Sequence, residues 1–198
     1  MKWVRTLYDW VLTWSDSKYG GVALFVIAFA EASFFPIPPD VLLIALCVGE
    51  RTKAIKFALI CLAGSVLGGA AGYAIGWGAW QAVDQFFFSG FVPGFTEEIY
   101  AKISNWYEEY DFWIVFVAAF TPFPYKVFTI AAGVFEISFP MFMLASLVGR
   151  AGRFFLVAGL LYFFGAPIRA FIDKWFNILV VLFTVILIGS FVLLKYLH

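Results

Sequence analysis

The chain has 198 residues, of which 64% are hydrophobic and 22% aromatic, while only 13% are charged. Soluble domains carry about 25% charged residues. The composition therefore excludes an ordinary soluble protein and predicts an all-α integral membrane protein, with residues 1–198 forming a single membrane domain. The formal net charge is zero, and we expect no nucleic-acid partner.

Residues 1–18 are expected to form an interfacial helix. Trp3, Leu7, Trp10 and Trp14 recur at three- and four-residue spacing and so share one helix face. Tryptophan suits the headgroup layer of a membrane. A helix that packs on the bundle fits the same pattern. The charges scattered through this segment leave no uninterrupted apolar core, so we expect no cleavable signal peptide.

The first apolar segment runs from Gly20 to Gly49 and is interrupted by Pro36, Pro38 and Pro39. Proline breaks a helix interior because it lacks the amide donor and its ring clashes with the preceding turn. The two arms would be roughly 24 Å and 15 Å long at about 1.5 Å per residue. Neither arm alone spans a hydrocarbon core of about 30 Å. The segment therefore either crosses once as a kinked helix or enters and returns on one side.

An uninterrupted span follows at residues 57–80 and completes a first repeat over residues 20–80. Glycines fall four apart on one face of this span, at Gly64, Gly68, Gly72 and Gly76. Such a small-residue stripe lets a neighbouring backbone approach closely. We interpret it as the surface against which the interrupted segments pack. Cys47 and Cys61 lie in apolar runs and are expected to be small buried side chains.

The rest of the chain divides in the same way. Residues 81–111 form an acidic connection, expected outside the cell, and residues 112–165 form a second repeat. That repeat contains another interrupted segment, broken at Pro122 and Pro124, and a span at residues 141–164. A final apolar run predicts a C-terminal transmembrane helix over residues 172–195.

The two breaks superpose when the chain is shifted by 86 positions, which places residues 34–38 over residues 120–124. Paired interrupted segments in two halves are typical of transporter sites. If both segments are re-entrant, the cytoplasmic side collects most basic residues, as the positive-inside rule requires, and Lys102 alone lies outside. The sequence thus predicts an inverted repeat of two re-entrant helical hairpins, each followed by a transmembrane helix, with the hairpin tips near the midplane.

Five ionisable residues fall at membrane depth, where charge is costly and usually functional: Glu31, Asp40, Lys126, Arg150 and Arg153. The two arginines are three apart, so they share a helix face. With the lysine they form a candidate phosphate site, because arginine binds phosphate through a bidentate fork. The two acids are candidate proton-exchange groups. The alternative is that these charges only pair and lock the hairpins.

Enzyme motifs are absent from the sequence. The single histidine is His198, the last residue, so no internal histidine-based triad or zinc site can form. An aspartyl dyad of Glu31 and Asp40 is the remaining catalytic alternative. We expect no enzyme, no metal and no cofactor.

The motifs around both breaks resemble the DedA family, also called the VTT or SNARE-associated Golgi protein family, and most closely its YqaA-like branch. The resemblance rests on Glu31, on residues 35–38 with Asp40 soon after, and on residues 120–126 with Gly133. It implies a bacterial inner-membrane protein with two opposed re-entrant hairpins. Family members are linked to proton-dependent transport and to lipid flipping, including that of undecaprenyl phosphate, and eukaryotic relatives scramble phospholipids.

The family's acidic pair matches Glu31 and Asp40. Its second hairpin usually has arginines three before and three after the proline, whereas here Thr121 and Val127 flank Pro124. This departure suggests that Arg150 and Arg153 replace those arginines.

Our leading hypothesis is a flippase or scramblase for an anionic phospholipid or a polyprenyl phosphate, with or without proton coupling. The alternatives are a proton-coupled transporter of small ions or drugs and a non-transporting assembly factor. The expected partners are membrane lipids and protons. The glycine stripe and the last helix also permit a homodimer.

Overall fold

A computed structural model describes residues 19–35, 37–86, 96–121 and 124–165. Every regular element in these ranges is helical, which confirms the all-α prediction. The elements in chain order are α2 (Gly20–Ser33), α3 (Asp40–Gly49), the 3-10 turn η1 (Arg51–Lys53), α4 (Ala54–Phe86), α5 (Glu97–Phe120), α6 (Tyr125–Val134) and α7 (Phe139–Phe164). The predicted interfacial helix 1–18, the C-terminal helix 172–195, Pro36 and Pro122 lie outside the described residues.

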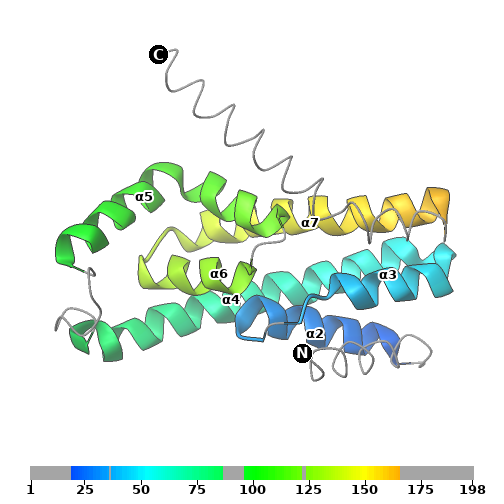
Figure 1. Cartoon of the computed structure of the whole chain (residues 1–198), viewed down its shortest axis with the longest axis horizontal. Helices are drawn as coiled ribbons and strands as arrows, with labels where there is room; N and C mark the ends of the chain where they lie inside the picture. Colours follow the sequence, from blue (N-terminus) through cyan, green and yellow to red (C-terminus); the bar gives the residue numbers. More distant parts are fainter. Residues whose placement is uncertain (1–18, 36, 87–95, 122–123, 166–198) are drawn as a thin grey trace, which may run out of the picture.

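Two long helices run along the length of the bundle (Figure 1). Within the described residues, Arg51–Trp80 and Phe139–Phe164 are long and apolar enough to cross a membrane. Each helix buries one side and exposes large apolar side chains on the other. Those on α4 and α7 are Ile55, Leu59, Leu67, Ile75, Trp77, Phe139, Met141, Leu144, Leu147, Val148, Leu156, Tyr162, Phe163 and Phe164. Such surfaces suit a hydrocarbon environment.

The helices α2 and α3 form a first pair around the proline break. Helix α2 ends at Ser33, and α3 begins at Asp40 directly after Pro39, which is its N-cap residue. The start of α2 and the end of α3 line one groove together with the start of α4. The chain therefore returns to the end of the bundle from which α2 set out. Beyond α3, the guanidinium of Arg51 donates to the carbonyl oxygens of Tyr162 and Phe163 at the end of α7.

The helices α5 and α6 form a second pair. Helix α5 continues through the expected end of the connection at Asp111, with a kink at Tyr110. Helix α6 begins after Pro124. The hydroxyl of Tyr100 donates to the carbonyl of Val134 over 3.0 Å, and its ring stacks on Trp80 at 5.3 Å. The start of α5, the end of α6 and the later part of α4 therefore lie together.

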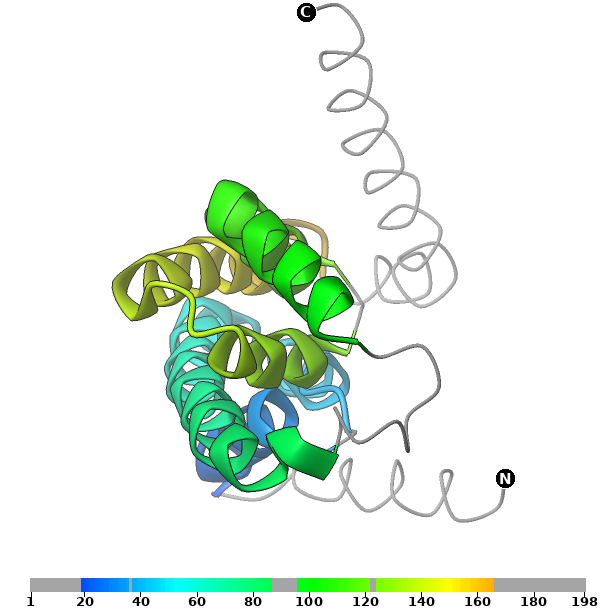
Figure 2. The same cartoon turned by 90° about the vertical axis from the view of Figure 1, so that its left-hand side faces the viewer.

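The two pairs gather at opposite ends of the long helices (Figure 1). Viewed from the end that holds the second pair, α6 lies between α5 and α4 (Figure 2). Helix α4 packs against α2, α6 and α7, while α5 packs mainly on α7. The long helices α4 and α7 thus form a frame that holds both pairs of helices.

The glycine stripe of α4 lies against both pairs. A Cβ atom at Gly68 would overlap the carbonyl oxygen of Phe29 in α2, and one at Gly76 would overlap that of Ile130 in α6. Gly64 is equally close to the backbone of α2, and Gly72 lies against Ala32 and Thr129. The absence of side chains therefore sets how closely the short helices approach α4.

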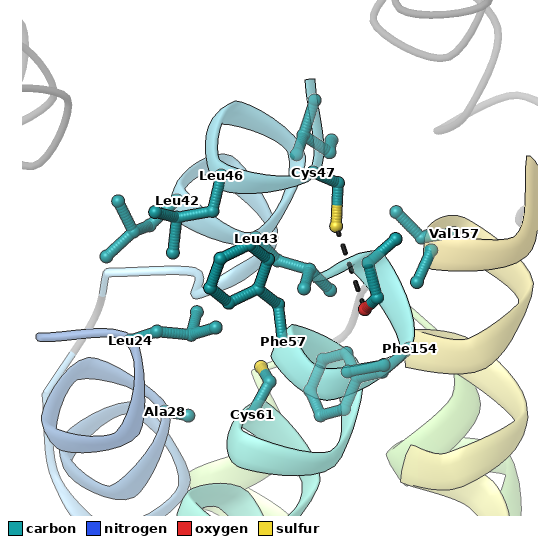
Figure 3. Packing of buried hydrophobic residues seen from close by; sticks show 14 of the residues in the cluster. Leu24, Ala28, Leu42, Leu43, Leu46, Cys47, Phe57, Cys61, Phe154 and Val157 are labelled. Atoms are coloured by element: carbon teal, nitrogen blue, oxygen red, sulfur yellow. Dashed lines mark hydrogen bonds between the residues drawn. The ribbon is translucent and has the colours of Figure 1, made fainter. Parts of the chain in front are cut away.

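Buried apolar side chains form two clusters. The first joins α2, α3, α4 and α7, and includes Leu24, Leu43, Phe57 and Phe154 (Figure 3). The second joins α5, α6 and α7 with Ala32 near the end of α2. Cys47 and Cys61 are buried free thiols in the first cluster. The polar groups described next lie where the short helices of both pairs meet α7.

Candidate functional site

Two buried ion pairs connect the first pair of helices to α7. Nη2 of Arg150 donates to Oε2 of Glu31 in α2 over 3.0 Å. Arg153 donates to Asp40, the first residue of α3, through Nε at 3.0 Å and Nη2 at 2.7 Å. The two arginines are one helical turn apart on α7, so a single helix face binds the carboxylates on both sides of the proline break.

Arg153 also reaches the second pair of helices. Its Nη1 donates to the carbonyl oxygen of Thr121, which directly follows α5. This carbonyl is one of the acceptors that a helix end leaves without an intrahelical partner. Arg153 thus connects Asp40, just after the first break, to Thr121, at the start of the second break. Its bidentate fork to Asp40 is the strongest geometry available to an arginine–carboxylate pair.

Arg150 is held differently. Its guanidinium carbon lies 4.0 Å from the ring centroid of Tyr125, the first residue of α6, and 5.7 Å from that of Phe154. Arg150 is 2% exposed, yet its Nε has no hydrogen-bond partner among the described residues. Since Glu31 accepts a single hydrogen bond from Arg150, the guanidinium keeps its Nε–H available for a second anion.

Tyr125 fixes the position of the Arg150 guanidinium. The tyrosine is completely buried, and its hydroxyl hydrogen-bonds Oγ of Ser146, one turn before Arg150 on α7. A cation above an aromatic face is stabilised by the ring quadrupole, by about 2 kcal/mol or more where water is excluded. The break before α6 therefore supplies the ring on which Arg150 rests.

Lys126 lies apart from the two ion pairs. Its Nζ is 3.5 Å from the carbonyl oxygen of Phe34, just beyond the end of α2. Nearby, Oγ1 of Thr129 donates to the carbonyl of Ala32 over 2.9 Å. These two α6 residues therefore satisfy carbonyls at the end of α2. Of the five ionisable residues expected at membrane depth, the structure brings four into salt bridges and places the fifth at a helix end.

Sequence reasoning missed the polar and aromatic neighbours of these charges. Tyr125 carried a usable signal, because it directly follows Pro124 and precedes Lys126. Ser146 lies four residues before Arg150 and therefore on the same face of α7. The carbonyl of Thr121 could not be found from sequence, because its side chain plays no part in the contact.

The charges of this cluster do not cancel completely. Its two acids and two arginines sum to zero charge, and Lys126 adds a positive charge at its edge. Among the residues that the structure describes, no three histidine, cysteine, aspartate or glutamate side chains are grouped to bind a metal ion. The chemistry available here is charge-assisted hydrogen bonding by arginine and proton exchange at carboxylates.

Comparison with known proteins places the chain among uncharacterised relatives. An uncharacterised protein of Haemophilus influenzae is 39% identical over 179 residues, covering 90% of this chain and 91% of its own length. A second, from Histophilus somni, is 35% identical over 86% of this chain and 87% of its own length. A third, from Methanocaldococcus jannaschii, is 26% identical over 68% of this chain and 79% of its own length.

No solved structure matches the chain. The VTT domain matches residues 37–163, which include part of the first proline break, α3, the whole second break and both arginines of α7. The chain therefore belongs to the VTT domain family, the DedA family of membrane proteins.

Proposed function

We propose that this protein is a membrane transporter that moves an anionic lipid, a phospholipid or a polyprenyl phosphate, by binding the headgroup at Arg150. The observation that carries the proposal is the state of that arginine. It is buried, stacked on Tyr125, bonded to Glu31 through one donor, and has an unpartnered Nε. A phosphate oxygen satisfies such a group more fully than a single carboxylate contact does.

The α2–α3 pair and the α5–α6 pair are proposed to be re-entrant hairpins that enter a membrane from opposite sides. The helix ends that lie away from the proline breaks gather at opposite ends of α4 (Figure 1). Arg51, Lys53 and Lys56 lie at the end that holds the first pair, while the connection 81–111 at the other end is acidic. The positive-inside rule then places the first pair on the cytoplasmic side of a bacterial inner membrane.

Proton coupling follows from competition for Arg150. A headgroup phosphate and the Glu31 carboxylate would both accept from the same guanidinium, so only one of them is fully bonded at a time. Protonating Glu31 removes its charge, so the guanidinium of Arg150 can then hydrogen-bond the phosphate instead. Arg153 has no such freedom, because Asp40 and the carbonyl of Thr121 already occupy its donors. Uptake of one proton would thus accompany binding of one anion.

The surroundings favour a lipid over a water-soluble anion. Phe34 and Phe35 at the first break are 63% and 39% exposed, and Val127 beside Lys126 is 56% exposed. In a membrane these side chains would face acyl chains. A lipid can keep its tails against them while its headgroup enters among the charges, whereas a small ion would need a pore closed to the bilayer.

A flipping assay in liposomes tests the proposal. We expect Arg150→Ala to slow the movement of a fluorescent phosphatidylglycerol tenfold or more, because a hydrogen bond to a charged group contributes about 1.5–3 kcal/mol. Glu31→Gln should leave flipping that no longer responds to pH. Lys102→Gln, an exposed residue of α5, is the matched control and should behave as wild type. Equal rates and equal pH dependence in all four proteins would refute the proposal.

One observation favours a non-transporting role for part of the site. The bidentate Asp40–Arg153 pair is closed and already links both breaks. In an assembly factor both ion pairs would serve only in this way. The liposome assay separates the two functions. An assembly factor would show no flipping activity even as wild type, and Glu31→Gln would lower the amount of folded protein.

A further inference from the structure

A separate groove lies at the end of the bundle that holds the first pair of helices. It has a volume of about 710 Å³ and is formed by the start of α2, the end of α3 and the start of α4. Ligand pockets usually measure about 300–1,000 Å³, so the groove is large enough for a headgroup and the first part of an acyl chain. None of the five ionisable residues at membrane depth lines it.

The wall and the rim of the groove differ in chemistry. The wall is apolar and includes Val22, Phe25, Leu46, Phe57 and Ile60. Val22 is 63% exposed, so part of this wall is open on the outside of the bundle. An apolar surface of this kind binds a hydrocarbon chain.

The rim carries more positive than negative charge. Lys53, Lys56 and Glu50 line it. Lys53 pairs with Glu50 over 2.5 Å, and both side chains are more than half exposed. One positive charge at the rim, that of Lys56, therefore remains for an anion.

We infer that this groove binds an anionic phospholipid, with its phosphate at Lys56 and an acyl chain along the apolar wall. Basic pockets between helices at the cytoplasmic surface bind acidic headgroups, and the orientation proposed above puts the groove on that side. The site is distinct from the Arg150 site. Lipid binding in the groove does not require either buried ion pair to break, and it is not a step of transport.

Binding to the full-length protein in detergent, measured by native mass spectrometry, tests this inference. Wild type should retain phosphatidylglycerol in preference to phosphatidylcholine with the same chains. Lys56→Gln should weaken phosphatidylglycerol binding about fivefold, because each lysine near anionic lipid contributes about 1 kcal/mol. Gly49→Leu should weaken binding of both lipids, because Gly49 lines the groove and a Cβ there meets no atom within 4 Å.

Each variant has a matched control outside the groove. Gly159 on α7 is equally open to a side chain, so Gly159→Leu should bind as wild type, as should Lys102→Gln. The inference is overturned if Lys56→Gln and Gly49→Leu both bind as wild type, or if millimolar inorganic phosphate displaces the lipid completely. Flipping measured on the same Lys56→Gln protein should be unchanged, so a failure of the transport proposal would leave this result standing.

Discussion

Replacing Arg153 with methionine is expected to lower the free energy of unfolding by about 3–5 kcal/mol, since removing one partner of a buried ion pair leaves an uncompensated charge. Arg153 is 7% exposed, as is Asp40. The substitution also removes the donor to the carbonyl of Thr121. Denaturant unfolding of the purified protein in micelles, followed by tryptophan fluorescence, measures the change.

A double variant separates the lost charge from lost packing. Arg153→Met combined with Asp40→Leu leaves no buried charge at this place, and well-packed apolar replacements of buried ion pairs are often neutral. The double variant should therefore recover more than half of the stability lost by Arg153→Met. If the free energy of unfolding of Arg153→Met alone were within 1 kcal/mol of wild type, the Asp40–Arg153 pair would not hold the two breaks together.

Gly76→Ala is expected to destabilise the protein by about 1–3 kcal/mol, which is the usual cost of forcing extra volume into a packed site. The added Cβ would overlap the carbonyl oxygen of Ile130 and lie 2.8 Å from its carbonyl carbon. These are backbone atoms and cannot rotate away. Helix α6 would have to move off α4, and Tyr125 would move with it.

Gly78→Ala is the matched control on the same helix. A Cβ at Gly78 meets no heavy atom within 4 Å. Alanine is favoured over glycine in an exposed helix by about 1 kcal/mol, so this variant should be slightly more stable than wild type. The same chemical change two residues apart thus has opposite expected signs. Thermal unfolding measures the change. If the unfolding temperatures of both variants shifted in the same direction by the same amount, the packing seen along the glycine stripe would be contradicted.

The local parts of the fold were predictable from the sequence. Proline dictates where a helix restarts, so α3 begins at Asp40 and α6 directly after Pro124, as the breaks indicate. The spans expected at residues 57–80 and 141–164 lie within α4 and α7. Helix α4 runs on to Phe86 and α5 passes through Asp111, because an apolar-to-polar change in sequence does not by itself end a helix.

The pairing of the charges was not predictable. Sequence placed three bases and two acids at one depth, but which base meets which acid depends on how α7 turns relative to α2 and α3. The structure gives each acid one arginine and sends Lys126 to the carbonyl of Phe34. The stacking of Arg150 on Tyr125 also depends on the approach of α6, which the small residues of α4 permit.

The central claim is that the headgroup of an anionic lipid binds Arg150, and the ¹⁵Nε–H resonance of that side chain reports on it most directly. Arg150→Lys assigns the signal by removing it, and Nε of Arg153, bonded to Asp40, is an internal reference. In nanodiscs, replacing phosphatidylcholine with phosphatidylglycerol should shift the Arg150 signal, and more strongly in Glu31→Gln, while the Arg153 signal stays in place. An Arg150 signal that is unchanged by lipid charge in both proteins would contradict the account.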